Sequence, residues 1–173
     1  MIRFKLQSGF TLVEAIIFIA IFSILLVAMV NISVSSLQAR NKNYSASEVH
    51  QNARIILDIL SQRIRAANGV NNGSSTFDSN SGVLSLSMAN GGVNPTVFDR
   101  DPTTQGLRMT EGVTTPVIIT SNTVKLTKLI FQNVTGTSSR RNIRIKITLS
   151  YANPSDPQFS YNYDFQTTVS LRQ

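Results

Sequence analysis

The pattern of apolar and polar positions divides the chain into three stretches. The first is an apolar run over residues 15 to about 34, in which Ser23 is the only polar residue before Asn31. At 1.5 Å rise per residue, this run spans about 30 Å as a helix, which is the thickness of the hydrocarbon core of a bilayer. The pattern therefore predicts a transmembrane helix near the N-terminus.

The second stretch keeps a helical period but becomes polar. No Gly or Pro interrupts the chain between Phe10 and Asn68. Within it, apolar residues recur every three or four positions, at Val49, Ala53, Ile56, Leu60, Ile64 and Ala67. This spacing places them on one face of an amphipathic helix. We therefore predict one helix over residues 10–67, capped by Asn68-Gly69, with an apolar stripe that packs against a sheet.

Beyond Gly69 the pattern changes to short strands. A connection rich in Gly, Ser and Asn, VNNGSSTFDSNSG, comes first. The clearest strands are IRIKITLSY (143–151) and YNYDFQTTVSL (161–171), which alternate in polarity and form a hairpin. The other strand candidates are 83–88, 97–98, 107–110, 116–120 and 123–133. The predicted fold class is α+β: one long N-terminal helix, membrane-spanning in its first half, with a small antiparallel β-sheet domain packed on its second half.

A short basic leader, MIRFKLQSG, precedes the apolar run and carries Arg3 and Lys5. Basic residues on this side predict that the N-terminus stays in the cytoplasm and the C-terminal part lies outside it. A secretory signal peptide begins similarly, and NISVSSLQA is a weak candidate for its cleavage site. The apolar run is longer than a typical signal-peptide core, however, and a signal peptide has no use for Glu14. A signal-anchored extracytoplasmic domain that never assembles is a further alternative.

Glu14 is the only charged residue between Leu6 and Ala39. A charged side chain costs on the order of 2.5–3.5 kcal/mol at the centre of a membrane helix, so this carboxylate needs an explanation. One explanation is that the positive N-terminal end of the helix dipole tolerates an acid there.

The segment SGFTLVE, residues 8–14, suggests another explanation, because it closely resembles the processing site of type IV prepilins and type II secretion pseudopilins. The resemblance implies that a prepilin peptidase cuts between Gly9 and Phe10 and then methylates the amine of Phe10. It also implies that Glu14 pairs with the N-terminal amine of a neighbouring subunit in the filament. Loss of the leader would leave 14 basic and 9 acidic residues, a formal charge of +5.

The resemblance also implies an organisation and a set of partners. The segments are a cytoplasmic leader (1–9), a transmembrane and filament-core helix (10–34), an amphipathic stalk helix (35–69) and a β-rich extracytoplasmic domain (70–173). The implied location is the cytoplasmic (inner) membrane, crossed once, and then a pilus or pseudopilus. The implied partners are other pilin or pseudopilin subunits, the prepilin peptidase, and an inner-membrane assembly platform with its ATPase.

Two departures favour a minor subunit within this family. Major pilins commonly carry a Gly or Pro within the apolar segment, and here there is none; the chain also has no cysteine to bound a C-terminal loop. The stalk sequence NARIILDILSQRIRAA resembles that of J-type minor pseudopilins and minor pilins. The resemblance thus implies a structural subunit that assembles into or initiates a type IV pilus or type II secretion pseudopilus.

Composition excludes most catalytic chemistry. Without cysteine the chain has no thiolate site and no Cys nucleophile, and with one histidine it has no His cluster. That histidine, His50, lies within the predicted helix, where we expect a polar residue of the helix surface and not a member of a Ser-His-Asp triad. We expect no enzyme activity, no cofactor and no metal. Asp99 and Asp101, in FDRDPTTQG, put two carboxylates in one loop, which leaves a calcium site open but is too few to predict one.

The 16 basic and 9 acidic residues give a formal charge of +7, and one basic cluster lies in SSRRNIRIK. Its members are Arg140, Arg141, Arg144 and Lys146. Alternation predicts that Arg144 and Lys146 lie on the polar face of their strand, where they could contact phosphates. The alternative function is therefore a minor pilin that binds DNA for natural transformation. No Tyr or Phe is interleaved on that face for base stacking, which favours a solvated strand face.

Overall fold

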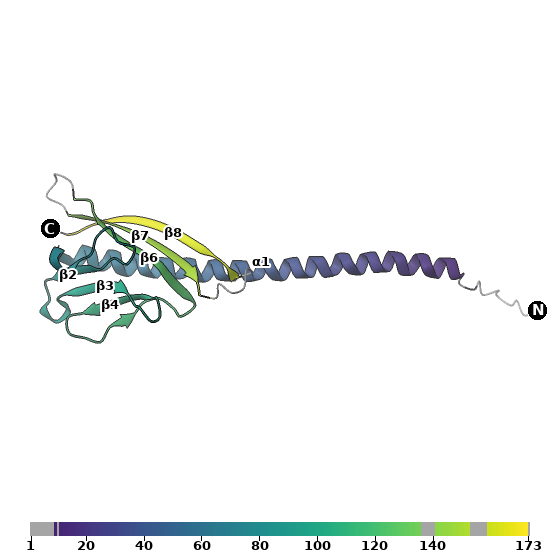
Figure 1. Ribbon diagram of the computed structural model, residues 1–173, viewed down its shortest axis with the longest axis horizontal. Coiled ribbons are helices and arrows are strands. Elements are labelled where there is room, and N and C mark those ends of the chain that lie inside the picture. Colours follow the sequence, from purple (N-terminus) through teal and green to yellow (C-terminus); the bar gives the residue numbers. More distant parts are fainter. Residues whose placement is uncertain (1–8, 10, 136–140, 153–158, 173) are drawn as a thin grey trace, which may run out of the picture. The chain divides into compact units, whose positions relative to one another are not determined.

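The computed structural model describes residue 9 and residues 11–135, 141–152 and 159–172 (Figure 1). The chain divides into two compact units, Met1–Arg40 and Asn41–Gln173. Helix α1, Leu12–Ala66, contributes residues to both units. The predicted long helix is therefore confirmed, and its described part ends one residue before the predicted position.

The start of α1 is set by Thr11. The backbone N–H of Glu14 donates to Thr11 Oγ1 at 3.3 Å, and the backbone N–H of Ala15 donates to the Thr11 carbonyl oxygen at 3.1 Å. A threonine that accepts from the third residue after it is an N-cap, and it satisfies one of the donors that the first helical turn leaves free.

The first unit contains the apolar part of α1. Its large apolar side chains are exposed, and the most apolar 18-residue window of the helix has no buried residue. Among the described residues, α1 is the one helix long and apolar enough to cross a membrane. Its serines do not leave free donors, because Ser23 Oγ donates to the Ile19 carbonyl at 2.7 Å and Ser33 Oγ to the Met29 carbonyl at 2.9 Å. The surface of this segment is therefore largely apolar, with Asn31 as an exposed polar residue.

The second unit packs two antiparallel sheets with the rest of α1. The five-stranded sheet has the order β1-β2-β3-β4-β5 and the three-stranded sheet the order β6-β7-β8. The strands are β1 (Ala67–Val70), β2 (Leu84–Met88), β3 (Thr96–Arg100), β4 (Leu107–Glu111), β5 (Val117–Ile118), β6 (Val124–Asn133), β7 (Asn142–Tyr151) and β8 (Asn162–Ser170). Two 3₁₀ turns, η1 (Asn72–Ser74) and η2 (Gly91–Val93), lie in the loops.

The core confirms the predicted stripe on α1. Its first five residues are buried on α1, the sixth, Ala67, is buried as the first residue of β1, and alternate residues of the strands are buried with them. In β7 the buried positions are Ile143, Ile145, Ile147 and Leu149, and the residues between them are partly exposed. Figure 1 shows the part of α1 that belongs to the second unit running along the β6–β7–β8 sheet, and one apolar cluster contains buried residues of this part of the helix and of both sheets.

Two predictions made from the sequence about this fold are wrong. The predicted cap at Asn68-Gly69 is part of β1, whose residues Ala67, Gly69 and Val70 pair with Met88, Ser87 and Leu86. The backbone there is satisfied by the ladder with β2, so no capping turn is needed.

The second error is the number of sheets, because the strands form two. The chain passes from β5 to β6 through residues 119–123, which are tied to α1 by the side chain of the buried Asn52. Ser121 N–H donates to Asn52 Oδ1 at 2.9 Å, and Asn52 Nδ2 donates to Ser121 Oγ at 3.1 Å. These bonds hold the crossing segment against the helix, between the strands of the two sheets.

The two edges of the three-stranded sheet differ. The edge of β6 is covered by residues 78–82: Gly82 N–H donates to the Leu129 carbonyl at 2.7 Å, and Leu129 N–H to the Asn80 carbonyl at 2.9 Å. A Cβ on Gly82 would lie 2.8 Å from the Leu129 carbonyl oxygen, so this close approach requires glycine. Strand β8 forms the other edge and pairs only with β7 among the described residues.

Candidate functional site

The first candidate site is the N-terminal segment. Gly9 is exposed, and a Cβ built on it meets no atom within 4 Å. Phe10 lies outside the described residues. Glu14 is exposed in the first turn of α1, and no described basic group forms an ion pair with its carboxylate. The partner that the sequence analysis expects for Glu14 is thus not supplied by the described part of the same chain.

The second candidate site is the outward face of the β6–β7–β8 sheet. Arg144 and Lys146 are partly exposed between the buried isoleucines of β7, on the predicted polar face. The register places Lys146 between Ile130 of β6 and Gln166 of β8, and Thr148 between Lys128 and Asp164. We call this surface, made of Lys125, Lys128, Ile130, Gln132, Arg144, Lys146, Thr148, Asp164 and Gln166, the basic face.

Lys125 and Lys128 are members of the basic face that the sequence analysis missed. The two residues are three apart, so in a regular strand they would lie on opposite faces. A register shift between Leu126 and Lys128 changes this, because Lys125 then pairs with Ser150 and Lys128 with Thr148, two residues on the same face of β7. The bulge adds both ammonium groups to the side of Arg144 and Lys146.

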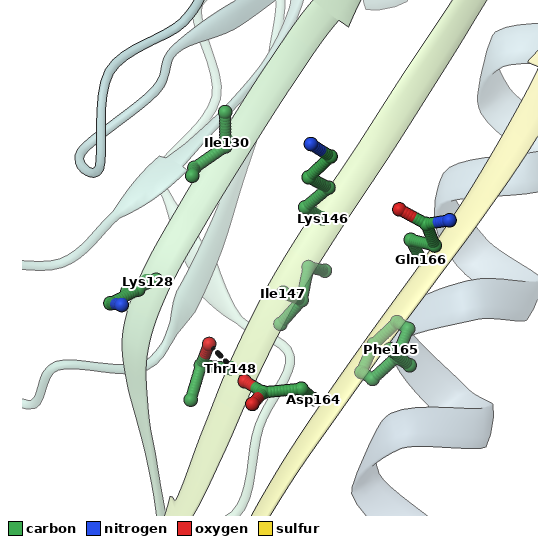
Figure 2. Close-up of a pocket in the computed structure, with 8 residues that line it drawn as sticks. All are labelled: Lys128, Ile130, Lys146, Ile147, Thr148, Asp164, Phe165 and Gln166. Atoms are coloured by element: carbon green, nitrogen blue, oxygen red, sulfur yellow. Dashed lines mark hydrogen bonds between the residues drawn. The ribbon is translucent and has the colours of Figure 1, made fainter.

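A hollow of about 380 Å³ opens on the basic face (Figure 2). Its lining residues are Lys128, Ile130, Lys146, Ile147, Thr148, Asp164, Phe165 and Gln166. Thr148 Oγ1 donates to Asp164 Oδ1, the bond dashed in Figure 2. Neither Lys128 nor Lys146 forms an ion pair with a described acidic residue. The hollow therefore presents two ammonium groups above a partly apolar floor.

Of the other two predicted basic residues, Arg141 is the one that the structure describes, and it does not line this hollow. Arg140 lies outside the described residues. Arg141 lines a separate hollow of about 110 Å³ with Val70, Asn72, Asn133, Thr135 and Ile143. Its Nη1 atom lies 3.2 Å from the place where a Cβ on Gly69 would be. Arg141 thus contacts the region of β1, away from Arg144 and Lys146.

The loop carboxylates Asp99 and Asp101 both bind Arg108. Arg108 Nε donates to Asp99 Oδ1 at 2.7 Å, its Nη2 pairs with Asp99 Oδ2, and its Nη1 lies 3.4 Å from Asp101 Oδ1. Among the described residues no group of three or more His, Cys, Asp or Glu side chains could hold a metal ion. In this loop the guanidinium takes the position between the carboxylates where a cation would bind.

Asp101 also closes its own turn. Its Oδ2 accepts from the N–H of Thr103 at 3.1 Å, from the N–H of Thr104 at 2.7 Å and from Thr104 Oγ1 at 2.9 Å. The Thr104 N–H is the main cause that lowers the pKa of Asp101, followed by the Thr104 hydroxyl. The hydrogen bond from Arg108 to Asp99 raises the pKa of Arg108.

We expect Asp101→Ala to remove a pH-dependent part of the stability of the second unit. Because folding lowers the pKa of Asp101 from 3.8, the carboxylate stabilises the fold fully above about pH 4, and this contribution is lost as the pH falls through the folded pKa. The free energy of unfolding should therefore fall more steeply below pH 4 in the wild type than in the variant. Denaturant unfolding of the full chain in detergent, followed by circular dichroism, measures this difference.

Asp101→Asn is the control for that experiment, because it keeps a hydrogen-bond acceptor but no longer titrates. It should share the weaker pH dependence of Asp101→Ala and be the more stable of the two. The same pH dependence in all three proteins would mean that Asp101 is not the titrating group.

His50 is a packing residue of α1. Its Nε2 lies 2.9 Å from the Tyr161 hydroxyl, and its ring meets that of Tyr163 edge-on, with the ring centres 4.4 Å apart. His50 is thus a polar residue of the helix surface that contacts the start of β8.

Comparison with known proteins bears on the first candidate site. The family model described as "Prokaryotic N-terminal methylation motif" matches residues 4–30, a range that includes Gly9, Phe10 and Glu14. No curated protein and no solved structure matches the chain. The match therefore identifies a known motif in the N-terminal segment only. What the second unit does must be inferred from its own structure.

Proposed function

We propose that this chain is a minor structural subunit of the type IV prepilin and pseudopilin kind, which assembles into or initiates a pilus or secretion pseudopilus; the methylation motif at its N-terminus supports this. The observation that carries the proposal is the matched motif at residues 4–30, continued by a membrane-length apolar helix. A separately packed unit follows, and its buried core needs no membrane. The absence of Gly and Pro from the apolar segment supports the minor role.

Processing would create the partner that Glu14 lacks. Hydrolysis of the Gly9–Phe10 bond leaves a carboxylate on the leader and an amine on Phe10, which a prepilin peptidase then methylates. Because the space around Gly9 is open, the described fold would accept a side chain at this position. We therefore expect that the peptidase, which must bind this backbone closely, is what requires glycine here. The new ammonium can pair with Glu14 of a neighbouring subunit, which has no partner within its own described chain.

The apolar surface of the first unit suits both environments that the proposal requires. In the membrane its exposed side chains contact lipid, and in the filament they contact the helices of other subunits. Transfer between two apolar surroundings gives little hydrophobic driving force, so close packing and specific polar contacts must favour the filament. The Ser23 and Ser33 hydroxyls already donate to carbonyls of their own helix. Glu14, the charged residue of this segment, is therefore the group that we expect to supply a polar contact between subunits.

The proposal includes a location and a set of partners. The N-terminus would face the cytoplasm and the second unit would lie outside the membrane, with residues 1–9 as the removed leader, 10–34 as the filament-core helix and 35–69 as the stalk. The β-rich domain over 70–173 would then face outward or cap the tip. The partners would be other pilin-like subunits, the prepilin peptidase and an assembly platform driven by its ATPase.

The proposal is tested by the mature N-terminus. The protein purified from membranes of cells that contain a prepilin peptidase should begin at Phe10 and carry one methyl group on its amine, as read by intact-mass and N-terminal fragment mass spectrometry. Gly9→Val should stay at full length, because a branched side chain blocks the approach of the enzyme to the backbone. Ser23→Ala is the control, and it should be processed normally. A mature chain that begins elsewhere would contradict the proposal.

The alternative function is DNA binding for natural transformation. The presence of Lys128 beside Arg144 and Lys146 on the basic face supports it. Two features oppose it: Asp164 lies on the same face, and the outward positions of β7 and β8 carry no aromatic ring for base stacking. Salt-dependent DNA binding by the full chain that is lost in Arg144→Ala and Lys146→Ala would favour it.

A further inference from the structure

We infer that the basic face of the β6–β7–β8 sheet is a docking surface for an extended, acidic segment of a different protein. The inference concerns the second unit alone. It does not depend on the processing of the N-terminus or on filament assembly.

The cations of the basic face have no acidic partner of their own. Lys125, Lys128, Arg144 and Lys146 form no ion pair with a described acid. Asp164 is the one acid among the residues of the face, and its Oδ1 is occupied by the Thr148 hydroxyl. Positive charge on this face is therefore available to groups that come from outside the described chain.

The spacing of the cations matches an extended peptide. Arg144 and Lys146 are two residues apart on one strand, so their Cα atoms are about 7 Å apart. Side chains on one face of an extended peptide repeat at the same distance. Lys128 is a diagonal neighbour of Lys146 across the ladder, at about 7–8 Å between Cα atoms. Each acidic residue at alternate positions of a bound extended segment would thus lie beside one of these cations.

The hollow suits a side chain of such a segment. Its volume of about 380 Å³ lies between Lys128 and Lys146, with Ile130 in its lining and the Gln166 amide at its border. A Glu side chain there would place its methylenes on Ile130 and its carboxylate near the two ammonium groups. Figure 2 shows Lys146 between Ile130 and Gln166, and Lys128 on the same strand as Ile130.

A second copy of this chain is a poor partner. Residues 41–173 carry 13 basic and 8 acidic side chains, so two copies repel each other. Most described acids of the unit are also engaged. The pairs are Asp99 and Asp101 with Arg108, Glu111 with Arg63, Glu48 with Thr123 and Asp78 with Gln132. Charge complementarity therefore favours a different, acidic protein.

A nucleic acid fits the face less well than an acidic peptide. Asp164 would repel a phosphate backbone drawn across β7 and β8. The apolar part of the hollow, from Ile130 and Phe165, also has no use in a contact with phosphates alone. A peptide segment can place methylenes on that surface and leave a gap in its charge opposite Asp164.

The test is binding of a fluorescein-labelled Glu-Thr-Glu-Thr-Glu-Thr peptide by the full chain in neutral detergent micelles, measured by anisotropy at low salt. The double variant Lys128→Glu, Lys146→Glu should bind on the order of tenfold more weakly, since each surface ion pair contributes little and two attractions become repulsions. The control, Arg54→Glu with Arg65→Glu, makes the same change of charge on exposed positions of α1 and should bind as the wild type does.

A charge-inverted peptide, Lys-Thr-Lys-Thr-Lys-Thr, distinguishes a lost site from a damaged fold. It should bind the Lys128→Glu, Lys146→Glu variant more tightly than the wild type. Equal weakening in the control and face variants, or no preference of the inverted peptide, would overturn the inference. A duplex DNA of the same total charge that displaces the acidic peptide from the face more effectively than unlabelled peptide would overturn it as well.

Discussion

A chain with Glu14→Leu is expected to insert into the membrane and to lose its leader, yet to be almost absent from filaments. Leucine removes a charge that is costly within an apolar helix, so insertion should not suffer. In the filament, however, the amine of Phe10 on a neighbouring subunit would be left without a partner. An unpaired buried charge costs on the order of 3–5 kcal/mol, which corresponds to a loss of more than a hundredfold in incorporation.

The measurement compares the amount of the subunit in sheared filaments with the amount in membranes, by immunoblot, after mass spectrometry has confirmed the mature N-terminus. Asp58→Leu is the matched control, because it makes the same substitution of charge at an exposed position of α1 in the second unit. It should enter filaments normally. Normal incorporation of Glu14→Leu would show that no ion pair with Glu14 is needed.

Ile56→Ala is expected to lower the free energy of unfolding of the second unit by about 2–5 kcal/mol. Ile56 is fully buried in the cluster that joins α1 to both sheets, so its truncation leaves a cavity that the surrounding strands cannot fill. Denaturant unfolding of the full chain in detergent, followed by near-ultraviolet circular dichroism of the tyrosines, reports this unit, because its four tyrosines all lie beyond residue 40.

Its neighbour Ile55 provides the control. Ile55 is 41% exposed and lies about 100° around the helix from Ile56. Ile55→Ala changes the same side chain and should cost about 0.5 kcal/mol or less, as surface substitutions do. Equal effects of the two substitutions would mean that α1 does not bury the face assigned to it.

The long helix and most strands are predictable from local patterns. The uninterrupted stretch before Asn68 and the stripe with Ile56 and Leu60 follow from spacing alone, as does the alternation of β7. Strand pairing is not local. Where the chain passes from one sheet to the other, Ser121 is hydrogen-bonded to Asn52 of α1, a contact between residues 69 positions apart. Likewise, Ala67–Val70 becomes a strand because β2 lies beside it, whereas its Asn-Gly pair is typical of a cap.

The two candidate sites differ in how far the sequence reveals them. Gly9, Phe10 and Glu14 are recognised by their resemblance to a motif, which the family match at residues 4–30 supports. The basic face is only half visible in the sequence. The alternation of apolar and polar residues in β7 identifies Arg144 and Lys146. Lys128 lies on the same face because of a bulge in β6, which no local sequence pattern predicts.

The covered edge of β6 has a consequence for crowding in a membrane, where copies of a protein reach high local concentration. A sheet with two free edges can add strands without limit and grow into ribbons. In this sheet, residues 78–82 close one side, and Gly82 makes that closure sterically possible. Two copies that met through β8 would form a closed pair with no free edge left to extend. Through this sheet, accidental association therefore stops at two copies and cannot propagate into a fibre.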